Sequence, residues 1–106
     1  MFTRICKISE VHEGELFRFD VMDKALLVVQ FRGSFFVTNS TCTHEEADLS
    51  LGMISSGVVT CPLHRAKFDI ETGEVIAGPD GGPPTEIPRL KAYPTRIEAE
   101  ELWADL

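Results

Sequence analysis

Short apolar runs separated by turn residues recur along the whole chain. They predict strands at residues 2–8, 16–21, 25–31, 35–38, 58–60, 68–70, 74–76, 90–98 and 102–106. The turn tripeptides at 32–34 and 71–73 each contain glycine and predict hairpins, with Gly73 at a position that needs positive φ. No window of about 11 residues has apolar positions at helical spacing without an interrupting Gly or Pro. The pattern therefore predicts an all-β fold, either a sandwich or a small barrel.

A loop-rich segment from about residue 39 to residue 84 separates the strands at the two ends of the chain. Its first part, 39–57, contains no clear strand pattern, and four of the six prolines fall within 79–88. Proline removes a backbone donor and fixes φ, so that stretch is expected to form a loop without regular pairing. With 106 residues, we expect one domain over 1–106 that consists of a β base and an inserted, loop-rich subdomain at about 39–84.

Charge and hydropathy exclude two classes of partner. The chain has 10 Lys plus Arg against 17 Asp plus Glu, a net charge of −7, which would repel a phosphate backbone, so we expect no nucleic-acid binding. The longest apolar run, residues 25–29, is far shorter than the roughly 20 residues that span a bilayer. No secretory signal pattern opens the sequence. We therefore expect a cytoplasmic protein that does not enter a membrane.

Two short motifs combine cysteine with histidine: Cys-Thr-His at 42–44 and Cys-Pro-Leu-His at 61–64, with 16 residues between them. Thiolates and imidazoles are ligands of both zinc and iron–sulfur clusters. Zinc fingers usually group their cysteines before their histidines, whereas here each motif supplies one of each. That alternation suits a binuclear cluster in which both cysteines bind one iron and both histidines the other. A zinc site and a chance pairing of buried residues are the alternatives.

These motifs, with the Gly/Pro-rich loop at 78–84, resemble the Rieske [2Fe–2S] family, and most closely the small ferredoxins of bacterial ring-hydroxylating dioxygenase systems. The resemblance extends over essentially the whole chain. It implies a Rieske-type β-sandwich base with an inserted cluster-binding subdomain. It also implies that Cys42 and Cys61 bind the inner iron, while His44 and His64 bind the outer iron through Nδ1.

The function that the resemblance implies is one-electron transfer and not catalysis. Electrons would come from an NAD(P)H-dependent flavin reductase and pass to a terminal oxygenase that hydroxylates aromatic rings, with both partners docking near His44 and His64. Two alternatives remain open: the small Rieske subunit of a nitrite reductase or another redox complex, and a zinc-stabilised interaction module.

Several positions depart from other members of the family. Where respiratory Rieske proteins have a disulfide, this chain has residues such as Ala47 and Leu63, so no disulfide is expected. Ala66 and Phe68 occupy positions at which high-potential members have hydroxyl donors to the cluster. Fewer donors stabilise the reduced cluster less, so we expect a potential in the lower part of the Rieske range.

Charged residues replace the usual glycine after each histidine. Glu45 follows His44 and Arg65 follows the second histidine. We expect these two side chains either to pair across the loops or to contact partners. Glu45, Glu46 and Asp48 form an acidic group, for which a solvated face and a docking surface for basic partners are both open.

Overall fold

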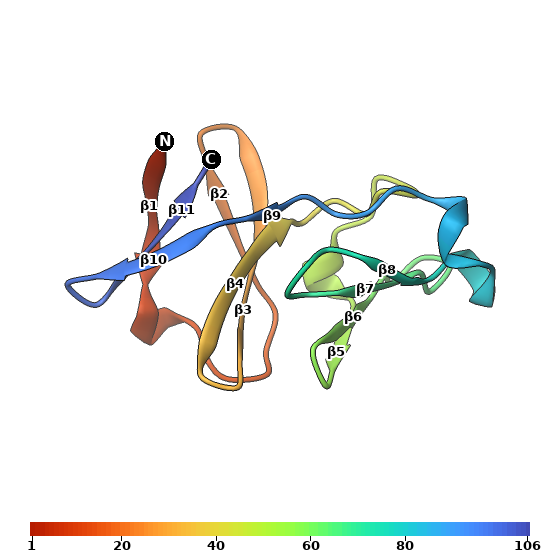
Figure 1. Ribbon diagram of the computed structural model, residues 1–106, viewed down its shortest axis with the longest axis horizontal. Coiled ribbons are helices and arrows are strands. Elements are labelled where there is room, and N and C mark those ends of the chain that lie inside the picture. Colours follow the sequence, from red (N-terminus) through yellow and green to blue (C-terminus); the bar gives the residue numbers. More distant parts are fainter.

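The strands of this chain form three antiparallel sheets, two of which make up a base and one of which extends from it (Figure 1). The computed structural model describes residues 1–106. One base sheet has the order β1 (Phe2–Lys7), β11 (Glu101–Asp105), β10 (Thr95–Glu98). The other has the order β2 (Phe17–Val21), β3 (Lys24–Phe31), β4 (Ser34–Asn39), β9 (Ala92–Tyr93). Both termini lie in the base (Figure 1).

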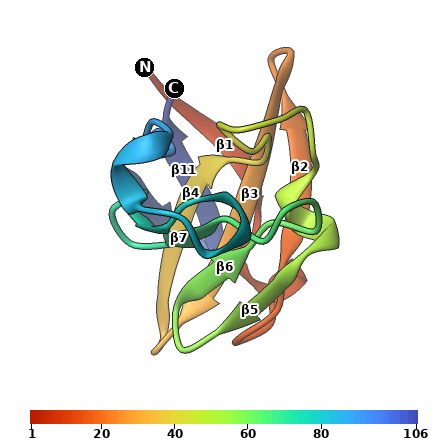
Figure 2. The ribbon, with the colours of Figure 1, turned by 90° about the vertical axis from the view of Figure 1, so that its right-hand side faces the viewer.

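The third sheet is built entirely from the middle of the chain. Its order is β5 (Met53–Ser55), β6 (Val58–Thr60), β7 (Lys67–Asp69), β8 (Val75–Ala77). Viewed from the end that carries it, β5, β6 and β7 stand in front of the base strands (Figure 2). The loop between β4 and η2, the loop between β6 and β7, and the proline-rich segment extend to the end of the molecule farthest from the termini (Figure 1).

Strand β3 is buried on both faces. Leu26 and Val28 belong to the core between the two base sheets, whereas Leu27 and Val29 belong to a second core beneath the third sheet. Successive side chains of a strand point to opposite faces, so a strand between two cores requires an unbroken apolar run. This double burial explains why residues 25–29 are the longest such run in the chain.

The all-β prediction is confirmed. Helical structure is limited to four single turns of 3₁₀ helix, η1 (Ile8–Glu10), η2 (Leu49–Leu51), η3 (Pro79–Gly81) and η4 (Pro84–Glu86). None of them approaches the length and apolar character that a membrane-crossing helix requires. The hairpin predicted around 71–73 is present between β7 and β8, with Gly73 at φ +80°.

Two details of the strand prediction are wrong. The expected strand at 90–98 is divided at Pro94 into β9 and β10, which pair in different sheets; proline supplies no N–H for a continuous ladder. Strand β5 lies in the stretch expected to lack strands. Its three residues are too few to give an alternating pattern, and Met53 is largely exposed.

Candidate metal centre

The two Cys/His motifs lie on loops that are closed in the same way. In the first loop (residues 42–47) the N–H of Cys42 donates to the carbonyl oxygen of Ala47 over 2.9 Å, and in the second loop (61–66) the N–H of Cys61 donates to that of Ala66 over 2.8 Å. Each loop thus begins at a buried cysteine and ends at a buried alanine. The first loop joins the end of β4 to η2, and the second joins β6 to β7.

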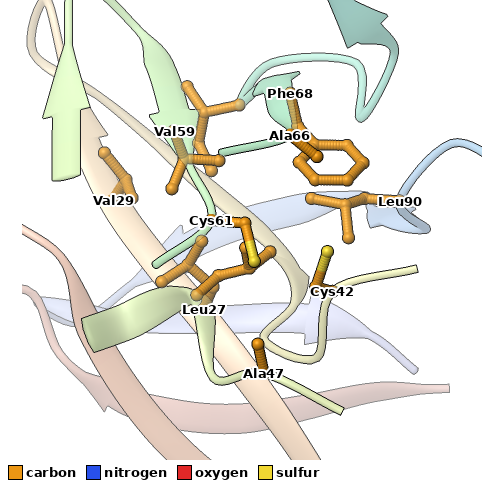
Figure 3. Close-up of a cluster of buried hydrophobic side chains, with 11 residues drawn as sticks. Leu27, Val29, Cys42, Ala47, Val59, Cys61, Ala66, Phe68 and Leu90 are labelled. Carbon is orange, nitrogen blue, oxygen red and sulfur yellow. The ribbon is translucent and has the colours of Figure 1, made fainter. Parts of the chain in front are cut away.

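Within the loops, the sulfurs and the imidazoles form separate layers. Cys42 and Cys61 are 4% and 1% exposed, among apolar side chains that include Phe68 and Leu90 (Figure 3). The side chains of His44 and His64 are 31% and 45% exposed. Their rings meet edge to face with 5.4 Å between centroids. The structure therefore gives an inner pair of thiols and an outer pair of imidazoles.

The thiol of Cys61 lies in an environment that disfavours free thiolate. Burial raises the pKa of the Cys61 thiol to about 11; a hydrogen bond from the backbone of Leu63 opposes this rise, and the neighbouring sulfur of Cys42 adds to it. A coordinating metal ion deprotonates a thiol outright. A buried thiol such as that of Cys61, which stays protonated on its own and becomes a thiolate on a metal, is well suited to hold a buried cluster.

The ligand atoms do not converge on one point, as a single zinc ion would require. His44, Glu45 and His64 form the only group of three or more such residues whose ligand atoms all lie within 4.8 Å of one another, and neither thiol belongs to this group. Tetrahedral zinc places all four ligands about 2.0–2.3 Å from one ion. A thiolate-bound inner iron and an imidazole-bound outer iron fit the two layers, so the residues present fit a Rieske-type [2Fe–2S] cluster.

The second loop adopts a strained backbone at its histidine. His64 and Arg65 have φ of +57° and +58°, whereas Glu45 does not have positive φ. Left-handed conformations of non-glycine residues cost about 1–3 kcal/mol each and are concentrated at functional sites. The glycine-like conformation after the histidine is therefore needed in the second loop only, where Arg65 adopts it.

Of the two roles expected for Glu45 and Arg65, the structure does not contain the ion pair across the loops. The carboxylate of Glu45 instead reaches the outer edges of both histidines, with Oε1 at 3.1 Å from Nε2 of His64 and 3.7 Å from Nε2 of His44. The sequence placed Glu45 next to one histidine but gave no sign that it contacts the other, which lies on a different loop.

The proline-rich segment lies against both loops. The hydroxyl of Thr43 donates to the carbonyl oxygen of Pro88 over 2.6 Å. The N–H of Asp80 donates to the carbonyl oxygen of His64 over 2.5 Å, and the carboxylate of Asp80 lies 3.6 Å from Nδ1 of that histidine. The segment thus covers one side of the two loops.

Asp48 anchors the first loop and does not belong to a solvated acidic face. Its carboxylate accepts hydrogen bonds from the Ser40 hydroxyl at 2.8 Å, from the Ser50 N–H at 2.9 Å and from Arg18 of β2 at 2.8 Å. Burial alone would raise the pKa of Asp48, but the hydrogen bonds from Ser50, Arg18 and Ser40 outweigh it and hold the pKa well below its ordinary range. The carboxylate thus ties the residues flanking the first loop to the base.

Replacing Asp48 with asparagine is expected to lower the free energy of unfolding at pH 7 by about 2 kcal/mol, because charge-assisted hydrogen bonds are lost. Because the pKa of Asp48 is lower in the folded protein than in the unfolded chain, where it is about 3.9, the ionised carboxylate stabilises the folded state at any pH above that value. This stabilisation is lost as the pH falls from there toward the folded-state pKa. The difference between wild type and Asp48→Asn should therefore be full at pH 6–7 and shrink below about pH 4. Thermal unfolding followed by far-UV circular dichroism at several pH values measures it; a difference independent of pH would contradict the assignment.

The comparisons with known proteins agree with this geometry. The profile of the Rieske [2Fe–2S] domain matches residues 1–94, and the chain belongs to this family. Its relatives include the ferredoxin component of biphenyl 2,3-dioxygenase from Rhodococcus jostii (strain RHA1), which is 35% identical over 98% of this chain and 92% of the relative. The ferredoxin of Sphingomonas yanoikuyae B1 superposes with a TM-score of 0.88 at 32% identity, covering 100% of this chain and 99% of that one. A further neighbour is a chain in a complex of reduced oxygenase and oxidized ferredoxin in carbazole 1,9a-dioxygenase, with a TM-score of 0.82 at 26% identity over 97% of this chain and 91% of that one.

The chain is therefore a Rieske-type ferredoxin. Its cofactor is a Rieske [2Fe–2S] cluster, and it is an electron-transfer protein and not an oxygenase. These predictions are confirmed, and the zinc-stabilised module is excluded. The three cysteines are free, in agreement with the expectation of no disulfide.

Proposed function

We propose that this ferredoxin carries single electrons from an NAD(P)H-dependent flavin reductase to a terminal oxygenase that hydroxylates aromatic rings. The observation that carries the proposal is the layered site, in which buried thiols hold the inner side and half-exposed imidazoles form the surface. Relatives that serve biphenyl dioxygenase, and a neighbour of the same fold in a complex with its oxygenase, support the terminal partner. The reductase is the donor that a carrier without a substrate site of its own requires.

The ligand roles proposed for the four residues follow the two layers. Cys42 and Cys61 would hold the inner iron, and His44 and His64 the outer iron, all within one domain over 1–106 whose cluster-binding part is about 39–84. The bound cluster supplies a reversible one-electron Fe³⁺/Fe²⁺ change, and imidazole ligands raise its potential above that of four-cysteine clusters. If Nδ1 of His64 binds iron, the carboxylate of Asp80, which lies 3.6 Å from that atom, has to move away.

The surface beside the second loop favours protein docking. Leu63 is 48% exposed next to His64, and Leu51 and Met53 are 75% and 72% exposed beside the same loop. A shallow groove of about 270 Å³ runs between Leu51, Met53, Pro62 and Arg65. Exposed apolar side chains that gather at one place indicate a protein contact surface. We therefore propose that partners cover this surface and bring their redox centres to the histidine edges.

We assign this exchange to the cytoplasm. Three free cysteines fit a reducing compartment, and NAD(P)H, the source of the electrons, is a cytoplasmic reductant. Localisation of a fluorescently tagged chain tests the assignment.

The proposed ligand set is tested by replacing one outer histidine and one unrelated histidine. His64→Ala should abolish the native visible absorption and the electron paramagnetic resonance signal of the dithionite-reduced protein. His12→Ala should leave both unchanged, because His12 is exposed in the base and has only Glu15 as an ionic neighbour, at 3.6 Å. A His64→Ala protein with an unaltered cluster spectrum would refute the assignment.

A further inference from the structure

Glu45 is the one carboxylate that spans the outer edges of both histidines. From the first loop it reaches across to the second, and its Oε1 lies 3.1 Å and 3.7 Å from the two Nε2 atoms. Its side chain is 39% exposed, so part of its charge is screened by water. Its ionic contacts are His44 and His64 alone, and no Lys or Arg neutralises it. A net negative charge therefore lies at the surface through which electrons pass.

The next residue provides a natural comparison. Glu46 carries the same charge one position along the same loop, but it is exposed and lies outside the group formed by Glu45 and the two histidines. The chain therefore contains two adjacent carboxylates that differ in their contact with the imidazoles and contribute equally to the net charge.

We propose that the Glu45 carboxylate lowers the reduction potential of the cluster, as a fixed negative charge at the imidazole edge. The inference deepens the proposed function and rests on His44 and His64 as ligands of the outer iron. Reduction adds one electron to the cluster, and Coulomb repulsion from a nearby carboxylate makes that addition less favourable. A carboxylate close to the free nitrogen of a metal-bound imidazole, as Oε1 of Glu45 is to Nε2 of His64 at 3.1 Å, also makes that imidazole a stronger donor to the metal. Both effects favour the oxidised state.

The test compares the midpoint potentials of four cluster-loaded proteins at pH 7 and low ionic strength: wild type, Glu45→Gln, Glu45→Lys and Glu46→Gln. At the wild-type midpoint, Glu45→Gln should raise the ratio of reduced to oxidised protein about tenfold, which for a one-electron couple is about 59 mV. Glu45→Lys should move the potential further in the same direction. Glu46→Gln should change the ratio less than about twofold, because exposed charges farther from the site are screened.

A second measurement separates charge from structure. The shift in Glu45→Gln should shrink at high salt if it arises from a partly exposed charge, whereas a rearranged loop would give a shift that salt does not change. Equal shifts in Glu45→Gln and Glu46→Gln, or a shift insensitive to salt, would overturn the proposal. So would a Glu45→Gln protein that no longer holds its cluster, because Glu45 would then be a structural link between the loops. Failure of the ligand set itself is distinguished by the His64→Ala spectrum.

Discussion

Replacing Phe68 with alanine is expected to lower the free energy of unfolding by about 3–5 kcal/mol, the range measured for aromatic residues removed from packed cores. Phe68 is completely buried on β7, directly after the second loop. Its ring lies near Ala66 and Leu90 in the core that also contains both cysteines (Figure 3). Truncation would leave a cavity in the core that contains the two cysteines. The apparent midpoint of thermal unfolding of the loaded protein, followed by visible absorption, should fall by about 12 °C or more.

Phe68→Leu is the control, because it keeps most of the buried volume. Phe68→Leu should lower the free energy of unfolding by less than about 1.5 kcal/mol and leave the visible spectrum of the cluster unchanged. If Phe68→Ala were as stable as Phe68→Leu, the ring would not be a packing element of the site, and the description of this core would be wrong.

Replacing Gly73 with alanine is expected to lower the free energy of unfolding by at least about 3 kcal/mol, because the substitution combines two unfavourable effects. Gly73 has φ +80°, which an L-residue rarely adopts, and an added Cβ would lie 2.2 Å from the carbonyl oxygen of Leu90. The N–H of Leu90 donates to the Gly73 carbonyl oxygen over 2.8 Å. The turn between β7 and β8 is thus held directly against the chain that returns to the base, and the backbone there has to move. Thermal unfolding and the rate of cluster loss measure the effect.

Gly33→Ala isolates the conformational part of that cost. Gly33 has φ +79°, in the turn between β3 and β4, but an added Cβ would meet nothing within 4 Å. Gly33→Ala should therefore lower the free energy of unfolding by about 1 kcal/mol, as expected for an L-residue in the left-handed region. Similar losses in the two variants would show that the contact of Gly73 with Leu90 adds nothing.

The features that sequence predicts well here are those determined locally. The hairpin at 71–73 and the strand at 25–31 follow from glycine placement and from apolar runs. The resemblance carried by the two Cys/His motifs implies an inner pair of cysteines and an outer pair of histidines. The structure places the two cysteine side chains in a buried layer and the two histidine side chains in a more exposed one.

The features that sequence missed depend on contacts between distant residues. Pro94 lies inside the stretch 90–98 that the sequence predicts as one strand, and only pairing with β4 and β11 shows that the strand changes sheets there. Asp48 reads as one of several neighbouring acids until Arg18, 30 residues earlier in the chain, is found beside it. Pairing of Glu45 with Arg65 is one of the two roles that the sequence leaves open for these residues, but the Glu45 carboxylate lies against the two imidazoles instead.

Strand β3, with one side in each core, makes the two halves of the molecule thermodynamically inseparable. Removing the metal-binding half would expose Leu27 and Val29, which are both 0% exposed in the intact chain. The remaining base would then carry an exposed apolar surface. Conversely, packing in either half is expected to stabilise the other half through this common strand, so destabilising substitutions in one core should weaken the other as well.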